Sequence, residues 1–108
     1  MRIYKHQWHD HDSVYFRNAD GGVTVNIYPD GTAEIRDLII WPESRGRGLG
    51  RLMLELAIQA AQIEHSRVML VRPDCEPWVL AWLQRKGFHE DLNYEPQDGK
   101  LPWTMILR

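Results

Sequence analysis

The chain has 108 residues, of which 44% are hydrophobic and 26% charged, and its formal net charge is −2. This length suits one core, so we expect a single domain over residues 1–108. The slightly acidic balance argues against general nucleic-acid binding, and no apolar run is long enough to span a membrane or to act as a signal segment. We therefore expect a cytoplasmic protein that binds neither nucleic acid nor membrane.

Cysteine and histidine usage limits the metal and redox chemistry. The single cysteine, Cys75, excludes an internal disulfide and a zinc site built from several thiolates. Residues 6–12 contain three histidines and two aspartates, but their spacing matches no standard zinc motif. We therefore expect no metal cofactor.

The N-terminal half has the pattern of short strands. Two β-prone runs, residues 13–17 and 23–28, are separated by a turn-forming segment at 18–22. A second turn, residues 28–32, precedes an apolar strand at 34–40. These short connections predict an antiparallel meander.

A helix is expected to begin near Gly48 and to continue to about Glu64, because apolar residues recur at spacings of three and four. The residues expected to form its buried stripe are Leu49, Leu52, Met53, Leu56, Ala60 and Ile63. A continuous apolar run at 68–71 follows, which is typical of a strand covered on both faces. The helix would return the chain to a strand parallel to 34–40.

The C-terminal part predicts a second helix and a hairpin. Pro77 suits the first turn of that helix, and Gly87 suits its end. Residues 88–94 and 101–107 predict a terminal hairpin around a turn at 96–99. The order of elements is therefore strands, helix, strand, helix and strands.

Residues 45–51 carry the strongest functional signal, because three glycines at alternate positions connect the strand at 34–40 to the following helix. Glycine permits backbone conformations that expose successive N–H groups, the helix N-terminus adds unpaired donors, and three arginines add positive charge. The segment is not a P-loop, since Arg51 and Leu52 follow its last glycine. It predicts a site for an anionic diphosphate, and the alternative is a tight connection without a ligand.

The pattern Arg45-x-x-Gly48-x-Gly50 resembles the acyl-CoA-binding motif of the GNAT acetyltransferase superfamily. Residues 37–45 are similar to the strand and turn that lead into that motif, and residues 82–88, which end in Gly-Phe, resemble the family's second signature. The resemblance implies an α+β (α/β) fold: a mixed, mostly antiparallel central sheet with two main helices, in which two splayed strands hold CoA.

The resemblance also implies an N-acetyltransferase that moves an acetyl group from acetyl-CoA to a primary amine without a metal. Backbone groups of Leu38, Ile39 and Ile40 would pair with the peptide-like pantetheine arm, and an N–H group there would stabilise the developing oxyanion. The diphosphate would rest on the loop formed by Arg45, Gly46, Arg47, Gly48, Leu49, Gly50 and Arg51.

Glu34 is the candidate general base, because a catalytic glutamate stands at a similar place in the histone-acetyltransferase-like branch of the family. The alternative is that Glu34 lies at the solvent end of its strand and pairs with Arg36 on the same face. Asp37, expected on the opposite face, is the second candidate, and its alternative role is that of a satisfied polar residue beside the loop.

The second signature departs from the family pattern at two positions. Leu83 stands where a tyrosine commonly protonates the departing thiolate, and Glu76 replaces a frequent asparagine. Tyr94, Cys75 and Tyr28 are the candidates to replace that acid, and of these Tyr94 is the one we assign as catalytic.

The N-terminal region is also shorter than the family pattern. Family members usually carry one or two helices between their first two strands, where this chain has only residues 5–12. The acceptor side is therefore expected to be open, or to be completed by a second copy in a homodimer. An open side suits an amine on a protein, such as a lysine or an N-terminus. The alternatives are a non-catalytic acyl-CoA-binding sensor and an interaction module that binds no CoA.

Overall fold

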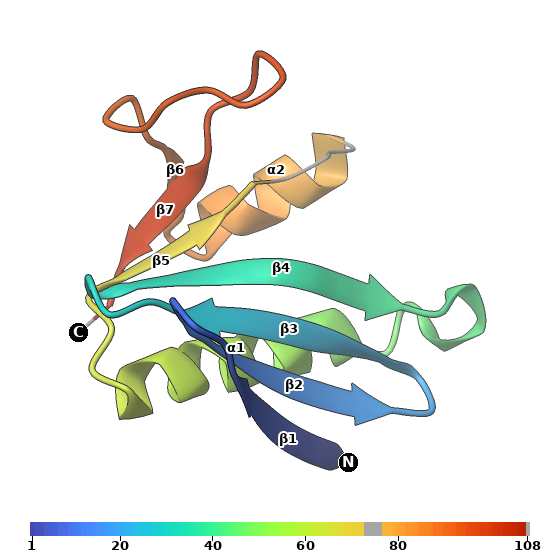
Figure 1. Ribbon diagram of the computed structural model, residues 1–108. Coiled ribbons are helices and arrows are strands. Elements are labelled where there is room, and N and C mark those ends of the chain that lie inside the picture. Colours follow the sequence, from blue (N-terminus) through green and yellow to red (C-terminus); the bar gives the residue numbers. More distant parts are fainter. Residues whose placement is uncertain (73–76, 108) are drawn as a thin grey trace.

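The computed structural model describes residues 1–72 and 77–107, which form one seven-stranded sheet and two α-helices (Figure 1). The strand order is β1-β2-β3-β4-β5-β7-β6, and β4 with β5 is the parallel pair in a sheet that is otherwise antiparallel across the described residues. The expected mixed, mostly antiparallel sheet with two main helices is confirmed.

The N-terminal half is an antiparallel meander, as predicted. Its strands are β1 (Arg2–Gln7), β2 (Asp12–Asn18), β3 (Gly21–Ile27) and β4 (Thr32–Ile40). The Asn18 side chain holds the β2–β3 turn, because its Oδ1 accepts hydrogen bonds from the backbone N–H groups of Asp20 and Gly21. Gly21 is required there, since a Cβ would overlap the carbonyl oxygen of Ile39 in β4. This turn therefore packs directly on the end of β4.

The middle of the chain connects two parallel strands. β4 continues through a short 3-10 helix, η1 (Pro42–Ser44), into α1 (Leu49–Ile63), which leads to β5 (Val68–Val71). The parallel β4–β5 ladder runs from the pair Thr32 with Val68 to the pair Ile35 with Val71 and then stops, although β4 extends to Ile40. Figure 1 shows the two strands diverging beyond this point. β4 and β5 are therefore the two splayed strands that the family resemblance implies.

The C-terminal hairpin is confirmed, although its strands are shorter than predicted. After α2 (Pro77–Arg85), β6 (His89–Glu90) pairs antiparallel with β7 (Trp103–Ile106). β6 ends early because the Asp91 carboxylate accepts hydrogen bonds from the Asn93 N–H group and the Thr104 hydroxyl, at 2.9 and 2.7 Å, which turns the chain into a long loop.

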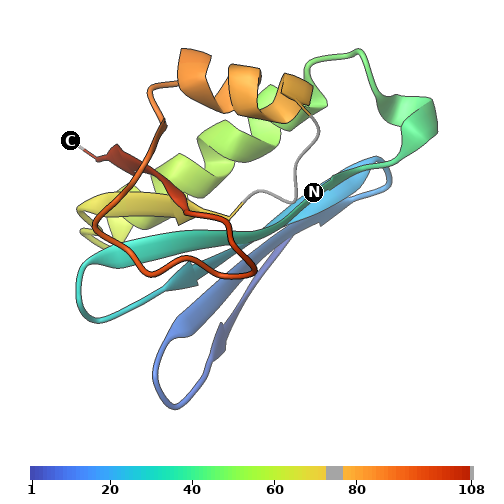
Figure 2. The ribbon, with the colours of Figure 1, turned by 90° about the horizontal axis from the view of Figure 1, so that it is seen from above.

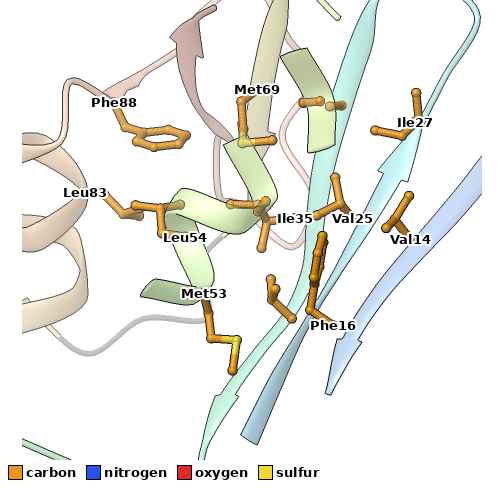
Figure 3. Packing of buried hydrophobic residues seen from close by; sticks show 14 residues of the cluster. Val14, Phe16, Val25, Ile27, Ile35, Met53, Leu54, Met69, Leu83 and Phe88 are labelled. Carbon is orange, nitrogen blue, oxygen red and sulfur yellow. The ribbon is translucent and has the colours of Figure 1, made fainter. Parts of the chain in front are cut away.

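Both helices lie on the same face of the sheet (Figure 2). They enclose a core to which Phe16, Ile35, Leu54 and Phe88 contribute buried side chains (Figure 3). In the part of the chain that the structure describes, no helix covers the opposite face, and no helix is long and apolar enough to cross a membrane.

The predicted buried stripe of α1 was partly wrong. Met53 is buried as expected, but Leu52 is 46% exposed and Ile63 is 74% exposed. Leu54, Ala57 and Ala61 are buried together with Met53, although the predicted stripe did not include them. Apolar residues surround much of this helix, so spacing alone did not identify its inner face. Ala57 and Ala61 determine which face of the helix is buried, because their small side chains let the helix backbone approach the sheet closely and leave no voids.

Candidate active site

A cleft opens where β4 and β5 diverge. It has a volume of about 750 Å³ and is bounded by three parts of the chain. One wall is β4 from Ile35 to Ile40, the second is the loop and helix start between Ser44 and Arg51, and the third comes from β5 and α2, with Val71, Arg72, Trp82 and Leu83.

The β4 wall presents a free strand edge to the cleft. One edge of residues 37–40 pairs with β3, from Asp37 with Thr24 to Ile40 with Gly21. The ladder on the other edge, to β5, ends at Ile35. The β3–β4 register also shifts beside Arg36, which stands opposite no β3 residue, so a β-bulge bends the strand at the start of the splay. Backbone groups of Leu38, Ile39 and Ile40 are therefore placed to pair with an extended, peptide-like molecule.

The glycine loop provides an open backbone surface. Gly46 and Gly48 have φ values of 84° and 75°, a region that L side chains rarely adopt. A Cβ built on Gly46, Gly48 or Gly50 would meet no other atom within 4 Å. The glycines are therefore not needed to relieve crowding inside the protein, and side chains at these positions would instead fill the space beside the backbone. A bulky group such as a diphosphate fits that space.

The start of α1 favours an anion. Gly48 is the N-cap residue and offers no side chain to bind the first N–H groups of the helix. The first turn contains no acidic residue, and it contains Arg51, whose positive charge is unfavourable at the positive end of the helix dipole. The unpaired N–H groups and the arginine together form a local site for negative charge.

The arginines of the loop are not equivalent. Arg45 donates through Nε to the Ile40 carbonyl oxygen at 3.1 Å, and Arg47 donates through Nη2 to Asp20 Oδ1 at 3.0 Å. Among the described residues, Arg51 has no hydrogen-bond or ion-pair partner, so it is the loop cation with an uncommitted guanidinium. Asp20 was missed by the sequence analysis, because in its turn it has only the signal of a hairpin residue.

Glu34 lies at the base of the splay but on the helix-free face. Its neighbours Ala33 and Ile35 point into the core, so strand alternation directs Glu34 to the opposite face. It pairs in register with Leu70, one step before the parallel ladder ends. The residue is only 9% exposed, so it does not lie at a solvent-exposed end of the strand, as the alternative had predicted. The ion pair with Arg36 that was part of this alternative is present, at 3.6 Å.

Three side chains surround the Glu34 carboxylate. Tyr28 donates its hydroxyl proton to Oε1 at 3.2 Å, while the guanidinium groups of Arg36 and Arg72 lie 3.6 and 3.9 Å from Oε2. The two cations compensate a negative charge that burial alone would disfavour. Sequence spacing gave no indication of Arg72, because its contact with Glu34 depends on the β4–β5 pairing.

A chain of polar side chains supports Tyr28 from the neighbouring strands. Trp8 Nε1 donates to Ser13 Oγ at 3.0 Å, and Ser13 donates to Asn26 Oδ1 at 2.6 Å. Burial raises the pKa of the Tyr28 hydroxyl, a hydrogen bond with Asn26 opposes this shift, and the nearby Glu34 charge adds to it. Tyr28 therefore keeps its proton at neutral pH and remains a donor to Glu34.

The other candidate catalytic residues are placed differently. Asp37 is exposed and lines the cleft, and its carboxylate has no hydrogen-bond or ion-pair partner among the described residues. The expectation that it lies on the face opposite to Glu34 was wrong, because the bulge at Arg36 shifts the alternation and places Asp37 on the same helix-free face. Tyr94 lies in the loop between β6 and β7 and is not among the residues that line the cleft. Leu83 lines the cleft but is only 2% exposed and belongs to the core. Cys75 and Glu76 lie outside the described residues.

The histidine-rich segment at 6–12 shows no metal site. Within residues 1–72 and 77–107, no group of three or more His, Cys, Asp or Glu side chains is arranged to hold a metal ion. His11 instead contacts Asp10 at 2.7 Å, and its ring lies 5.1 Å from that of Tyr28.

Splayed strands with a free edge, next to a glycine loop at a helix N-terminus, form the kind of site that holds an acyl-CoA. Comparison with known proteins agrees. The sequence model of the Acetyltransferase (GNAT) family matches residues 1–88, so the chain belongs to this family of acyl-CoA-dependent N-acyltransferases. No curated protein sequence matches the chain.

Solved structures share the fold. The chain superposes on Tetrahymena GCN5 with a TM-score of 0.73 at 16% identity, covering 94% of this chain and 71% of that one. It superposes on the ribosomal-protein-S18-alanine N-acetyltransferase from Escherichia coli with a TM-score of 0.72 at 16% identity, covering 94% of this chain and 72% of that one. For the IAA acetyltransferase from Bacillus cereus the TM-score is 0.72 at 17% identity, and the superposition covers 91% of this chain and 79% of that one. At these identities the similarity establishes the fold, and the three names indicate no common acceptor.

Proposed function

We propose that the chain transfers an acetyl group from acetyl-CoA to a primary amine on a protein, either a lysine side chain or an N-terminus. The observation that carries the proposal is the continuity of the cleft: a free strand edge at residues 36–40 leads directly into an open glycine loop at 45–51. These two surfaces match the two chemically different parts of CoA, the amide-containing pantetheine arm and the diphosphate.

In this proposal, Leu38, Ile39 and Ile40 bind the pantetheine arm as an added partial strand. The N–H groups of the loop and of the α1 N-terminus bind the diphosphate, and Arg51 adds a mobile cation. A β4 N–H group near the bulge at Arg36 would polarise the thioester carbonyl and stabilise negative charge on its oxygen. The family implies acetyl-CoA as the acyl donor.

Glu34 is the proposed base. An alkyl ammonium with a pKa near 10.4 must lose its proton before it can attack, which costs roughly 4 to 5 kcal/mol at pH 7. Glu34 lies beside the end of the β4–β5 ladder, on the face that has no covering helix among the described residues. An amine approaching from that face would pass the carboxylate, directly or through a water molecule, before it reaches the splay. Asp37, on the cleft wall, is the second candidate.

The leaving thiolate has no hydroxyl donor at the position of Leu83. A thiol with a pKa near 8.5 is a tolerable leaving group without one, so transfer would be slower but not abolished. Tyr94 remains the proposed acid, and it can act only if the β6–β7 loop brings it toward the cleft.

The helix-free face favours a protein acceptor. A small amine needs a pocket that encloses it, whereas an exposed lysine or N-terminus brings its own surface. A second copy of the chain, as a homodimer, is the other way to complete this side.

The absence of a donor at Leu83 also favours a second function, that of an acyl-CoA-binding protein without turnover. The test measures CoA thiol released from acetyl-CoA with a lysine-containing peptide, a peptide with a free N-terminus and a small amine. Release that depends on a peptide amine supports the transferase. CoA binding without amine-dependent release supports the second function, and failure to bind CoA contradicts both.

A further inference from the structure

Asp20 reaches the glycine loop from a distant part of the chain. It lies in the turn between β2 and β3, yet the hydrogen bonds that its oxygen atoms accept all come from the segment that follows β4. Its backbone oxygen accepts a hydrogen bond from the Trp41 N–H group at 2.9 Å. Its Oδ1 accepts hydrogen bonds from the Ser44 hydroxyl at 2.7 Å and from Arg47 Nη2 at 3.0 Å. Figure 1 shows the β2–β3 turn and the η1 loop at the same end of the sheet.

Asp20 is itself held rigidly. Asn18 binds the N–H groups of Asp20 and Gly21, and Gly21 pairs with Ile40 at the end of β4. The carboxylate is therefore fixed relative to the strand from which the loop departs.

A carboxylate beside an anion site is electrostatically unfavourable, so its role needs an explanation other than charge. We propose that Asp20 is a positioning residue for the diphosphate: through Ser44 and Arg47 it fixes residues 44–48 so that the loop N–H groups face the cleft. This inference rests on the proposed acetyl-CoA site. Without such a contact, a segment containing Gly46 and Gly48 would have to be ordered by the ligand, at a cost in conformational entropy that weakens binding.

The two contacts of Asp20 are unequal. The Arg47 side chain is 60% exposed, and exposed ion pairs contribute little. Ser44 is 4% exposed, so its hydroxyl would lose a partner without access to water. The hydrogen bond from the buried Ser44 hydroxyl therefore carries most of the positioning. Arg47 also donates to the Ser44 carbonyl oxygen, at 3.4 Å, so both of its hydrogen bonds support the loop.

The test is calorimetric titration of CoA into the wild type and four variants: Asp20→Ala, Asp20→Asn, Ser44→Ala and the double variant Asp20→Ala/Ser44→Ala. Asparagine keeps an oxygen acceptor for Ser44, so Asp20→Asn should bind within about threefold of the wild type. Asp20→Ala and Ser44→Ala should each bind CoA about tenfold more weakly. Because both remove the same contact, the double variant should be no weaker than either single one. Melting of the unliganded variants confirms that they are folded.

The alternative interpretation is that Asp20, by pairing with Arg47, only prevents this arginine from binding the diphosphate. In that case Asp20→Asn and Asp20→Ala would both bind CoA more tightly than the wild type, and this result would overturn the proposal. Unchanged affinity in Asp20→Ala would do so as well. A parallel titration with pantetheine, which lacks the diphosphate, should show no effect of Asp20→Ala, and an equal loss for both ligands would also refute a role at the loop. Failure of the wild type to bind CoA is a separate result that contradicts the proposed function itself.

Discussion

Replacing Gly50 by leucine tests the diphosphate site most directly. Gly50 is the second residue of α1, and a Cβ there meets no atom within 4 Å. Leucine is a better helix former than glycine by about 0.5 to 1 kcal/mol, so the fold should be retained or stabilised. Gly48 is a poorer choice, because its φ of 75° would strain any side chain and confuse loss of binding with loss of structure.

The expected loss follows from the contacts that the leucine side chain would block. A hydrogen bond to a charged group contributes about 1.5 to 3 kcal/mol. Loss of two amide contacts to the diphosphate would cost about 3 to 6 kcal/mol, or roughly 10²- to 10⁴-fold in the dissociation constant of CoA. Gly50→Ala is the matched control, because its single methyl group is small and would meet no atom within 4 Å.

The assay is the shift in melting temperature on adding CoA or acetyl-CoA, with ATP as a comparison ligand. At 100 times its dissociation constant, a ligand stabilises the folded state by about 2.7 kcal/mol. At about 4 °C per kcal/mol, the wild type and Gly50→Ala should each gain roughly 11 °C. Gly50→Leu should gain almost nothing at the same concentration. A full shift in Gly50→Leu would show that the diphosphate does not rest on this loop, and the assignment would be refuted.

Three further predictions concern the base and the sheet. Glu34→Gln should lower the acetylation rate most at pH values below the acceptor's pKa while leaving CoA affinity unchanged; an identical pH–rate profile would give Glu34 a structural role only. Tyr28→Phe removes a hydrogen bond to the Glu34 carboxylate, so amine-dependent CoA release should slow several-fold while CoA affinity stays unchanged, and an unchanged rate would disconnect Tyr28 from catalysis. Hydrogen bonds from Asn93 and Thr104 lower the pKa of Asp91, so its contribution to stability should be present above the unfolded-state pKa and be lost as pH falls through the lower folded-state value. The melting-temperature difference between wild type and Asp91→Asn should accordingly shrink below about pH 4, and a difference that grows on acidification would contradict this sign.

The fold could be predicted from sequence wherever local patterns decide it. Gly48 marked the start of α1, and the apolar run at 68–71 gave β5 and its parallel pairing. The inner face of α1 could not be read from spacing, because Leu52 and Ile63 are as apolar as the residues that became buried. Packing against the sheet selected the alanines instead.

In the candidate site, too, the residues that are close in sequence could be predicted, and those brought together by packing could not. The glycine loop and the β4 edge are contiguous in sequence, so one motif indicated both. Asp20 and Arg47 are 27 residues apart and meet only because the β2–β3 turn packs on the end of β4. Arg72 reaches Glu34 through the register of β4 with β5. Sequence reasoning finds residues that act through their neighbours along the chain, and it misses those that act through pairing between strands.

Strand β4 explains how so short a chain could support this chemistry. Its free edge and the loop that follows it supply the proposed contacts with CoA, and Glu34, on the helix-free face of the same strand, supplies the proposed base. The proposed donor and acceptor sides would therefore meet where the β4–β5 ladder ends, at Ile35 and Val71. The family pattern described above has helices between its first two strands, and this chain has none between β1 and β2. A chain without such helices keeps every element of the proposed donor site, and an amine-bearing protein would supply the missing wall of the proposed acceptor side.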